Sequence, residues 1–203
     1  MKIGILAFGS LVDDPGDELI KHITKPRIKV ETHFMVEYCR SSNGRNGAPT
    51  LVPVQEGGST VQAYILPLLG VSLSKAKNMI YRREINKPGE VSNLYHHTDT
   101  PSINKTIIDE HKNIHGFDIL LTARLQPNLD EVTPEVLADL AIKSARGNSI
   151  VKDRDGITYL WRNISNGIIT PLTSSYEQSI LDKLNVETLE EAISIMKIKA
   201  SSS

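Results

Sequence analysis

The sequence contains one cysteine, few aromatic residues and no long apolar run, and its charges nearly cancel. Its single cysteine, Cys39, has no second cysteine with which to form an intrachain disulfide, which is typical of a reducing compartment. No apolar run approaches the roughly 18 residues of a membrane-spanning helix, and the first residues lack the pattern of a cleaved signal peptide. We therefore expect a soluble, cytoplasmic protein that has no membrane partner.

The balance of charges argues against nucleic acid as a partner. The chain has 23 lysine and arginine residues against 24 aspartate and glutamate residues, a net charge of −1, and no basic block. Binding to a phosphate backbone requires concentrated positive charge. A chain of 203 residues can form a hydrophobic core without disulfides or metals. Because no internal repeat or low-complexity linker divides it, we expect one domain over residues 1–203.

The sequence also lacks the common metal and phosphate motifs. His111 and His115 are four residues apart, but neither a cysteine pair nor a His-Glu-x-x-His motif accompanies the histidines. The Asp-Arg-Asp-Gly stretch at 153–156 lacks the glutamate of a calcium loop. No phosphate-loop motif and no Gly-x-Ser-x-Gly motif surrounds Ser10. We expect no metal site.

Strand patterns dominate the first part of the chain and helix patterns the last part. Apolar and polar residues alternate, or apolar residues cluster, in segments that predict strands over 2–8, 27–38, 50–54, 59–69, 103–108 and 116–125. Helical spacing predicts helices over 72–83 and 135–145 and leaves 156–167 ambiguous. Two capping boxes, Ser175 with Gln178 and Thr188 with Glu191, predict C-terminal helices from about 175 to 198. The second to fourth strands follow one another too closely for helical crossovers. We therefore expect an α+β fold with a mixed, mostly antiparallel, small β-barrel and flanking helices.

The opening stretch, KIGILAFGSLVDDPG, contains the most informative pattern in the chain. An apolar strand ends at Phe8 and is followed by Gly9-Ser10-Leu11 and then by an Asp-Asp-Pro-Gly turn. Glycine adopts backbone angles that other residues avoid, and successive N–H groups at such a corner can converge on one anionic oxygen. The corner is either a structural turn or an anion-binding site.

Two later segments carry charged residues suited to chemistry on an amide. Glu84 follows the helix predicted over 72–83, where a carboxylate opposes the helix dipole. It is either a partner of its neighbouring arginines in a surface ion pair or a general acid–base group. Arg40 and Arg45 flank a polar loop, and a guanidinium fork matches a carboxylate, although arginines are also common in exposed loops. Cys39, at a strand end, is more typical of a half-buried thiol than of a nucleophile.

Taken in order, these segments resemble the γ-glutamylcyclotransferase superfamily, most nearly its ChaC-like branch. Phe8-Gly9-Ser10-Leu11 with Asp14-Pro15-Gly16 is similar to the family's Tyr-Gly-Ser-Leu…Pro-Gly opening, with phenylalanine in place of tyrosine. Tyr38-x-Arg40 and Arg45-x-Gly47-x-Pro49 resemble the branch's Tyr-x-Arg…Arg-Gly-x-Pro segment. Arg83-Glu84 followed by Tyr95 resembles the Arg-Glu…Tyr element that carries the family's catalytic glutamate. The resemblance extends over roughly residues 3–180.

The resemblance implies a barrel fold and a lyase that cleaves a γ-glutamyl amide, such as glutathione, to 5-oxoproline and a free amine without a cofactor. It implies Glu84 as the catalytic acid–base group, and together with the needs of the reaction it gives six substrate-binding residues: Phe8, Gly9, Ser10, Leu11, Arg40 and Tyr95. Among these, we expect N–H groups of Gly9–Leu11 to bind the α-carboxylate or the oxyanion, Arg40 to make a second carboxylate contact, and Tyr95 to bind the substrate or to orient Glu84. Asp13 stands where the branch has tryptophan or another apolar residue, which argues against glutathione as the specific substrate. The expected partner is a small γ-glutamyl molecule, and the expected state is a monomer or homodimer. The alternatives are an enzyme acting on another γ-glutamyl-amine or isopeptide conjugate, and a noncatalytic member that binds a small ligand.

Overall fold

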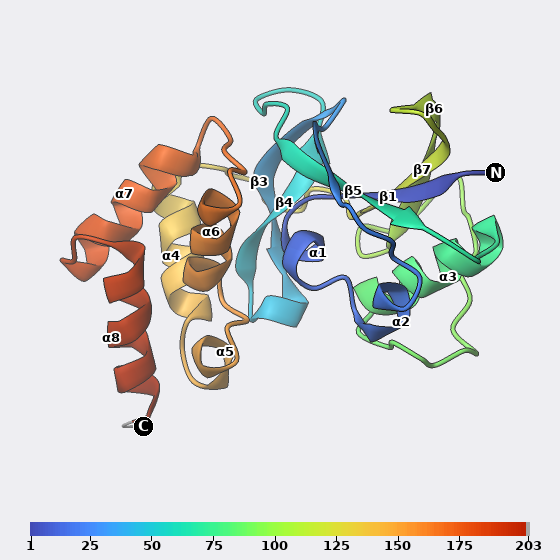
Figure 1. The fold of residues 1–203 in the computed structure, drawn as a ribbon. Helices are drawn as coiled ribbons and strands as arrows, with labels where there is room; N and C mark the ends of the chain where they lie inside the picture. The colour runs from blue at the N-terminus through green and yellow to red at the C-terminus, as the bar shows by residue number, and fades with distance from the viewer. Residues whose placement is uncertain (202–203) are drawn as a thin grey trace. The chain divides into compact units, whose positions relative to one another are not determined.

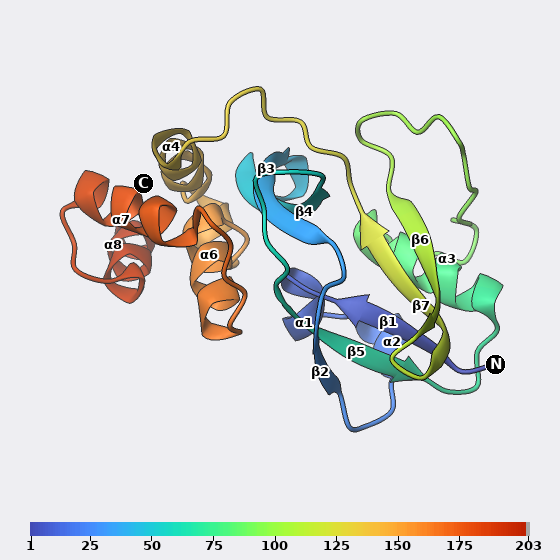
Figure 2. The same ribbon diagram turned by 90° about the horizontal axis from the view of Figure 1, so that it is seen from above.

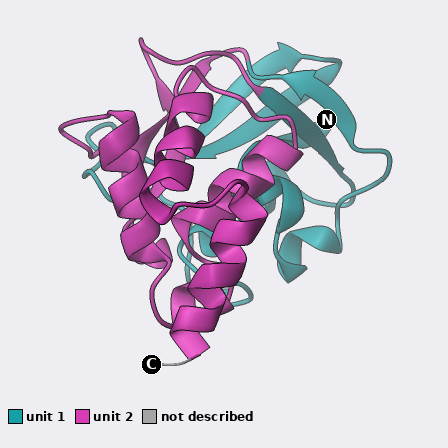
Figure 3. Ribbon diagram, turned by 90° about the vertical axis from the view of Figure 1, so that its left-hand side faces the viewer, with its two compact units in different colours: residues 1–32, 62–126 teal, residues 33–61, 127–203 magenta. Residues whose placement is uncertain are grey.

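The computed structural model describes residues 1–201, which form an α+β protein (Figures 1 and 2). These residues divide into two compact units, shown in different colours in Figure 3. Unit 1 contains residues 1–32 and 62–126, and unit 2 contains residues 33–61 and the described residues from 127 onward. Each unit is assembled from segments far apart in the sequence. The expectation of one domain over the whole chain stays a prediction.

A five-stranded sheet in the order β2-β5-β1-β7-β6 forms the centre of unit 1. Its strands are β1 (Ile3–Ala7), β2 (Ile28–Glu31), β5 (Gln62–Leu68), β6 (Ile107–Ile114) and β7 (Phe117–Arg124). The central strand β1 is antiparallel to β5 and parallel to β7, and the two outer pairs are antiparallel. All of β1 is buried, as its unbroken apolar pattern predicts for a central strand.

Three helices accompany this sheet within unit 1: α1 (Ser10–Asp13), α2 (Asp17–Ile20) and α3 (Leu73–Glu84). The Ser72 hydroxyl caps α3 by accepting a hydrogen bond from the Lys75 N–H at 3.3 Å. Ala76, Met79 and Ile80 are buried on one face of α3, which packs against β7 and α2. The end of α3 is thereby held near the turns that follow β1.

Unit 2 combines a β-hairpin with a group of helices. The hairpin pairs β3 (Met35–Ser42) with β4 (Ala48–Val54) around a short 3₁₀ turn, η1 (Asn43–Arg45). The helices are α4 (Pro134–Ser144), α5 (Asn148–Val151), α6 (Gly156–Ser165), α7 (Thr173–Leu184) and α8 (Leu189–Ser201). Both α4 and α6 pack against β4, and α7 packs against α4. Tyr38 and Tyr176 are fully buried in this core, with ring centroids 5.3 Å apart.

The structure confirms the α+β class and the mixed, mostly antiparallel sheet, but residues 1–201 contain no closed barrel. Within these residues the five-stranded sheet is open, because its outer strands β2 and β6 do not pair with each other. The single strand predicted over 27–38 is two strands in different sheets, because β2 pairs with β5 while β3 pairs with β4. Alternation predicts a strand but carries no information about its partner.

The capping predictions for the last helices had different outcomes. The Thr188 hydroxyl accepts from the Glu191 N–H at 3.2 Å, so Thr188 caps α8 as predicted. The Ser175 prediction is wrong: α7 begins two residues earlier, and the Ser175 hydroxyl donates to the Leu172 carbonyl instead. Thr173 is the residue that engages the chain before this helix, because its hydroxyl accepts from the Thr170 N–H at 2.8 Å. Within residues 1–201, no helix is long and apolar enough to span a membrane.

Candidate functional site

The corner after β1 is a sharp turn into the single-turn helix α1. Gly9 has φ of 60° and ψ of −141°, a combination that is essentially restricted to glycine. The N–H groups of Ser10 and Leu11 precede the first intrahelical bond of α1, and no hydrogen bond from either is present among residues 1–201. The corner therefore has two backbone N–H groups with no acceptor among residues 1–201, and their binding of an anion stays a prediction.

Glu84 lies at the C-terminal end of α3 and is joined to the corner by its neighbour Arg83. The Glu84 Oε1 accepts a hydrogen bond from Arg83 Nη1 at 2.7 Å, and the Arg83 Nη2 donates to the Ser10 hydroxyl at 3.2 Å. The Glu84 side chain is 21% exposed and that of Arg83 is 15% exposed. Both are therefore partly withdrawn from solvent. One guanidinium thus connects the predicted acid–base group to the predicted anion-binding corner.

Arg83 is also fixed to the turn between α1 and α2. Its Nε and Nη2 both donate to the Asp14 carbonyl, at 3.1 and 2.7 Å. The Asp14 carboxylate in turn accepts from the Gly16 N–H at 3.1 Å. Gly16 has φ of +83°, and a side-chain carbon added there would lie 3.2 Å from Cγ of Arg83. Glycine at this position therefore allows the positive φ and also leaves room for the Arg83 side chain.

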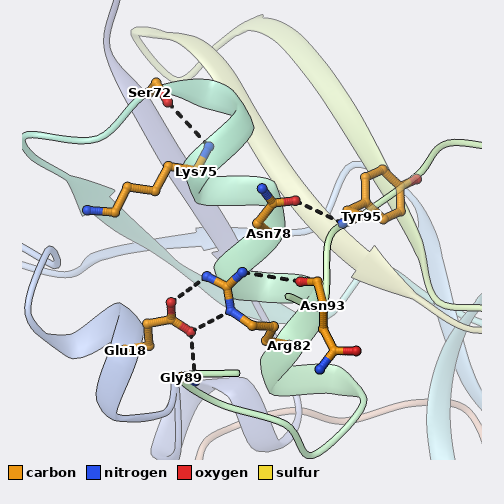
Figure 4. Close-up of polar contacts among 8 residues, drawn as sticks. All are labelled: Glu18, Ser72, Lys75, Asn78, Arg82, Gly89, Asn93 and Tyr95. Carbon is orange, nitrogen blue, oxygen red and sulfur yellow. Dashed lines mark hydrogen bonds and ion pairs between the residues drawn. The ribbon is translucent and has the colours of Figure 1, made fainter. Parts of the chain in front are cut away.

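A second arginine of α3 organises the loop that follows this helix (Figure 4). Arg82 forms a two-point ion pair with Glu18, and its Nη1 donates to the Asn93 carbonyl at 3.2 Å. Glu18 also accepts from the Gly89 N–H at 3.2 Å. The hydrogen bond from Arg82 is the largest of the effects that lower the pKa of Glu18. The loop after α3 is therefore tied to helices α2 and α3 by charge-assisted hydrogen bonds.

Tyr95 belongs to the same loop and is bound to α3 and to β6. Its N–H donates to the side-chain oxygen of Asn78 at 2.8 Å, as Figure 4 shows, and its hydroxyl accepts from the Ile108 N–H at 3.1 Å. Its ring lies 5.8 Å from the ring of Tyr81, three residues before Glu84 on α3. The structure thus makes Tyr95 an anchor of the loop, and its predicted contact with substrate or Glu84 stays a prediction.

The remaining predicted site residues lie at two places. Phe8 is half-buried in unit 1, between β1 and the corner. Arg40 belongs to β3 of unit 2, where it is buried, and burial lowers the pKa of its guanidinium. Its predicted role as a second carboxylate contact stays a prediction. Arg45, weighed with Arg40 in the sequence, stacks over the Tyr159 ring at 4.3 Å, also within unit 2.

Sequence reasoning missed two buried carboxylates in unit 2. Glu37 accepts from the Thr170 hydroxyl at 2.6 Å, the Tyr38 N–H at 2.8 Å and the Leu172 N–H at 3.1 Å, and burial raises its pKa. Asp155 is fully buried and caps α6, where it accepts from the Thr158 N–H at 2.9 Å. Burial raises the pKa of Asp155 as well. The Asp-Gly-x-Thr pattern before an apolar stripe was a usable signal for the cap.

The described residues offer no metal centre and no activated thiol. Residues 1–201 contain no group of three or more histidine, cysteine, aspartate or glutamate side chains placed to hold a metal ion. Cys39 is half-buried, and burial is the main cause that raises the pKa of its thiol, with a smaller contribution from Glu37. A raised pKa leaves less of the thiolate that acts as a nucleophile. Of the predicted groups, Glu84 with the corner is the one for which the structure shows a connected arrangement.

No model of a known protein family, no curated protein and no solved structure matches the chain. The resemblance to the γ-glutamylcyclotransferase superfamily therefore remains a prediction from the quoted motifs.

Proposed function

We propose that this protein is an enzyme of the γ-glutamylcyclotransferase type, which cleaves a γ-glutamyl amide to 5-oxoproline and a free amine. The observation that carries the proposal is the connection from Ser10 through Arg83 to Glu84. Residues 10 and 84 come from distant parts of the sequence, and the motif resemblance names both as site residues. A γ-glutamylcyclotransferase-like fold is part of the proposal, and the mixed sheet of unit 1 is compatible with it, although this sheet is open.

The chemistry follows from the substrate. A γ-glutamyl group carries its own nucleophile, because its α-amine can attack its γ-carbonyl and close a five-membered ring. The enzyme then has to hold the chain curled, remove a proton from the α-ammonium group, stabilise the tetrahedral oxyanion and protonate the leaving nitrogen. A new C–N bond closes the ring as the original amide C–N bond breaks, so neither an oxidant nor a second substrate is needed.

Glu84 is the proposed proton carrier. The α-ammonium group first loses one proton to solvent. As the resulting amine attacks, the Glu84 carboxylate takes a second proton from the attacking nitrogen and gives it to the departing amine, so that one residue serves both transfers and a neutral lactam is left. The N–H groups of Ser10 and Leu11 are the proposed donors to the oxyanion or to the α-carboxylate of the substrate. Glu84 is at the negative end of the α3 dipole, where a carboxylate is unfavourable unless a cation offsets it. Arg83 supplies that cation at 2.7 Å.

The same ion pair favours a second candidate, a noncatalytic protein that binds a small ligand at this corner. A carboxylate that already has an arginine partner can be purely structural. Assay of 5-oxoproline after incubation with glutathione and with several γ-glutamyl amides separates the candidates. Release from glutathione or from another γ-glutamyl amide supports the enzyme and identifies its leaving group. Calorimetric binding of these compounds with no release of 5-oxoproline supports the noncatalytic protein instead.

A further inference from the structure

We infer that Arg83 is a positioning residue, which holds the Glu84 carboxylate beside the corner formed by residues 9–11; the inference rests on the function proposed above. From the sequence we predicted Arg40 as the substrate-binding arginine, and Arg83 was only the neighbour of Glu84 in a motif. The structure assigns Arg83 a different place. It is the residue that contacts both Ser10 and Glu84.

The hydrogen bonds of Arg83 to the protein leave too few N–H groups for bidentate binding of a substrate carboxylate. A guanidinium group has five N–H donors. In Arg83, Nε–H and one Nη2–H go to the Asp14 carbonyl, the other Nη2–H goes to Ser10, and one Nη1–H goes to Glu84. A single Nη1–H remains, and bidentate recognition of a further carboxylate needs two parallel donors.

The acceptors of Arg83 are themselves held in place. The Asp14 N–H donates to the Ser10 carbonyl at 2.9 Å, and the Asp14 side chain is bonded to the Gly16 N–H. The side chain of Arg83 therefore spans a turn whose two ends are fixed to each other. Because Arg83 is itself only partly exposed, the carboxylate of Glu84 is fixed through a short, rigid path to the corner.

Arg82 offers a matched comparison on the same helix. Consecutive helical residues point about 100° apart, from 3.6 residues per turn, and Arg82 reaches Glu18 and the Asn93 carbonyl instead of the corner. Its side chain is 5% exposed. Loss of Arg82 therefore removes a buried, charge-assisted contact of the same kind without touching Ser10 or Glu84. Comparison of Arg82 and Arg83 variants therefore separates an effect on folding from an effect on the position of Glu84.

The test compares steady-state kinetics of 5-oxoproline release for the wild type, Arg83→Met, Arg83→Ala and Arg82→Met, using the γ-glutamyl amide that the wild type cleaves fastest. Because a misplacement of about 1 Å at a reacting group reduces rates by about 100-fold, we expect Arg83→Met to lower kcat by roughly 10- to 100-fold. We expect KM to change by less than about threefold, since the residue does not bind substrate. Arg82→Met lowers the melting temperature, but it leaves the kcat of the folded protein near the wild-type value.

Chemical rescue adds a readout that a purely structural role does not move. Guanidinium ion added to Arg83→Ala, with sodium chloride at equal ionic strength as control, should raise kcat, whereas the same addition to Arg82→Met should not. Two results would overturn the inference while the proposed function stands. One is a wild-type kcat in Arg83→Met. The other is a loss of kcat that guanidinium does not rescue in Arg83→Ala and that Arg82→Met reproduces. If the wild type releases no 5-oxoproline, the proposed function fails. A crystal structure of Arg83→Met then decides the inference: a reoriented Glu84 side chain supports it, and an unmoved one overturns it.

Discussion

Replacement of Glu18 by glutamine removes the negative charge that neutralises buried Arg82, with little change in shape. Arg82 donates to both carboxylate oxygens, one of them at 3.0 Å, and the Gly89 N–H donates to the same carboxylate at 3.2 Å. A hydrogen bond to a charged group contributes about 1.5–3 kcal/mol, and breaking a fully buried ion pair costs roughly 3–5 kcal/mol. Because the Glu18 side chain is 22% exposed, we expect Glu18→Gln to lower the free energy of unfolding by about 2–3 kcal/mol.

Urea denaturation followed by far-UV circular dichroism measures this loss, with Glu90→Gln as the matched control. Glu90 pairs with Lys87 in the same loop, but the two side chains are 49% and 52% exposed. Exposed pairs contribute at most about 1 kcal/mol. We also expect faster hydrogen exchange at the Gly89 amide in Glu18→Gln, because its acceptor is weakened. Equal destabilisation by the two substitutions would refute the reasoning that the Glu18–Arg82 pair anchors the loop.

The stability lost in Glu18→Gln, relative to the wild type, should depend on pH in a definite direction. Contact with Arg82 lowers the pKa of Glu18, so the folded protein keeps this carboxylate ionised at pH values where the unfolded chain protonates it. The stabilisation by Glu18 is therefore present above the pKa of the unfolded carboxyl, about 4.3, and is lost as the pH falls through the lower, folded pKa. The difference in unfolding free energy between the wild type and Glu18→Gln should shrink as the pH falls from about 4.3 through the folded pKa of Glu18. A gap that stays constant down to about pH 2 contradicts the assignment.

Three further predictions concern other parts of the chain. Burial raises the pKa of Glu37, so its contribution to stability is full below about pH 4 and is lost as the pH rises through its folded pKa. The unfolding free energy of Glu37→Gln, read from Trp161 fluorescence, should therefore decline less above about pH 4 than that of the wild type. Parallel curves of unfolding free energy against pH for the two proteins would count against this. Tyr95→Phe should lose about 1 kcal/mol of stability and speed hydrogen exchange at the Ile108 amide, and unchanged exchange there argues against the anchoring role. Gly156→Ala places a carbon 2.7 Å from Cα of Ala141, so it should destabilise the protein by about 1–3 kcal/mol, and an unchanged melting temperature would show that this contact can relax.

Local patterns predicted much of the fold. The helix α4 has Pro134 at its first position, and the Thr133 hydroxyl accepts from the Val136 N–H at 3.3 Å, so its start is specified within four residues. The apolar run of β1 similarly predicts a buried strand. The separation of β2 from β3 was not predictable in this way, because it depends on which distant strand each one pairs with. Closure of a barrel is a property of the whole sheet and has no local signal.

The candidate site shows the same division. The backbone at Gly9 could be predicted, because a small-residue corner between a strand and a helix needs a positive φ. The contact between Arg83 and Ser10 could not be predicted from the sequence, because it depends on how the end of α3 approaches the turn after α1. Glu37 follows the alternation that puts Glu31 on the outer face of a strand, yet it is buried because the segment at Thr170–Leu172 supplies hydrogen-bond donors to it.

The rate of 5-oxoproline release by Glu84→Gln, relative to the wild type on the same γ-glutamyl amide, tests the proposed chemistry most directly. Glutamine keeps the shape of the side chain and can still accept from Arg83, but it cannot carry a proton. A positioned acid–base group contributes about 100- to 10,000-fold, so we expect turnover to fall by at least about 100-fold while the melting temperature stays near that of the wild type. Full wild-type turnover in Glu84→Gln would remove Glu84 from the mechanism and contradict the proposed function of this site.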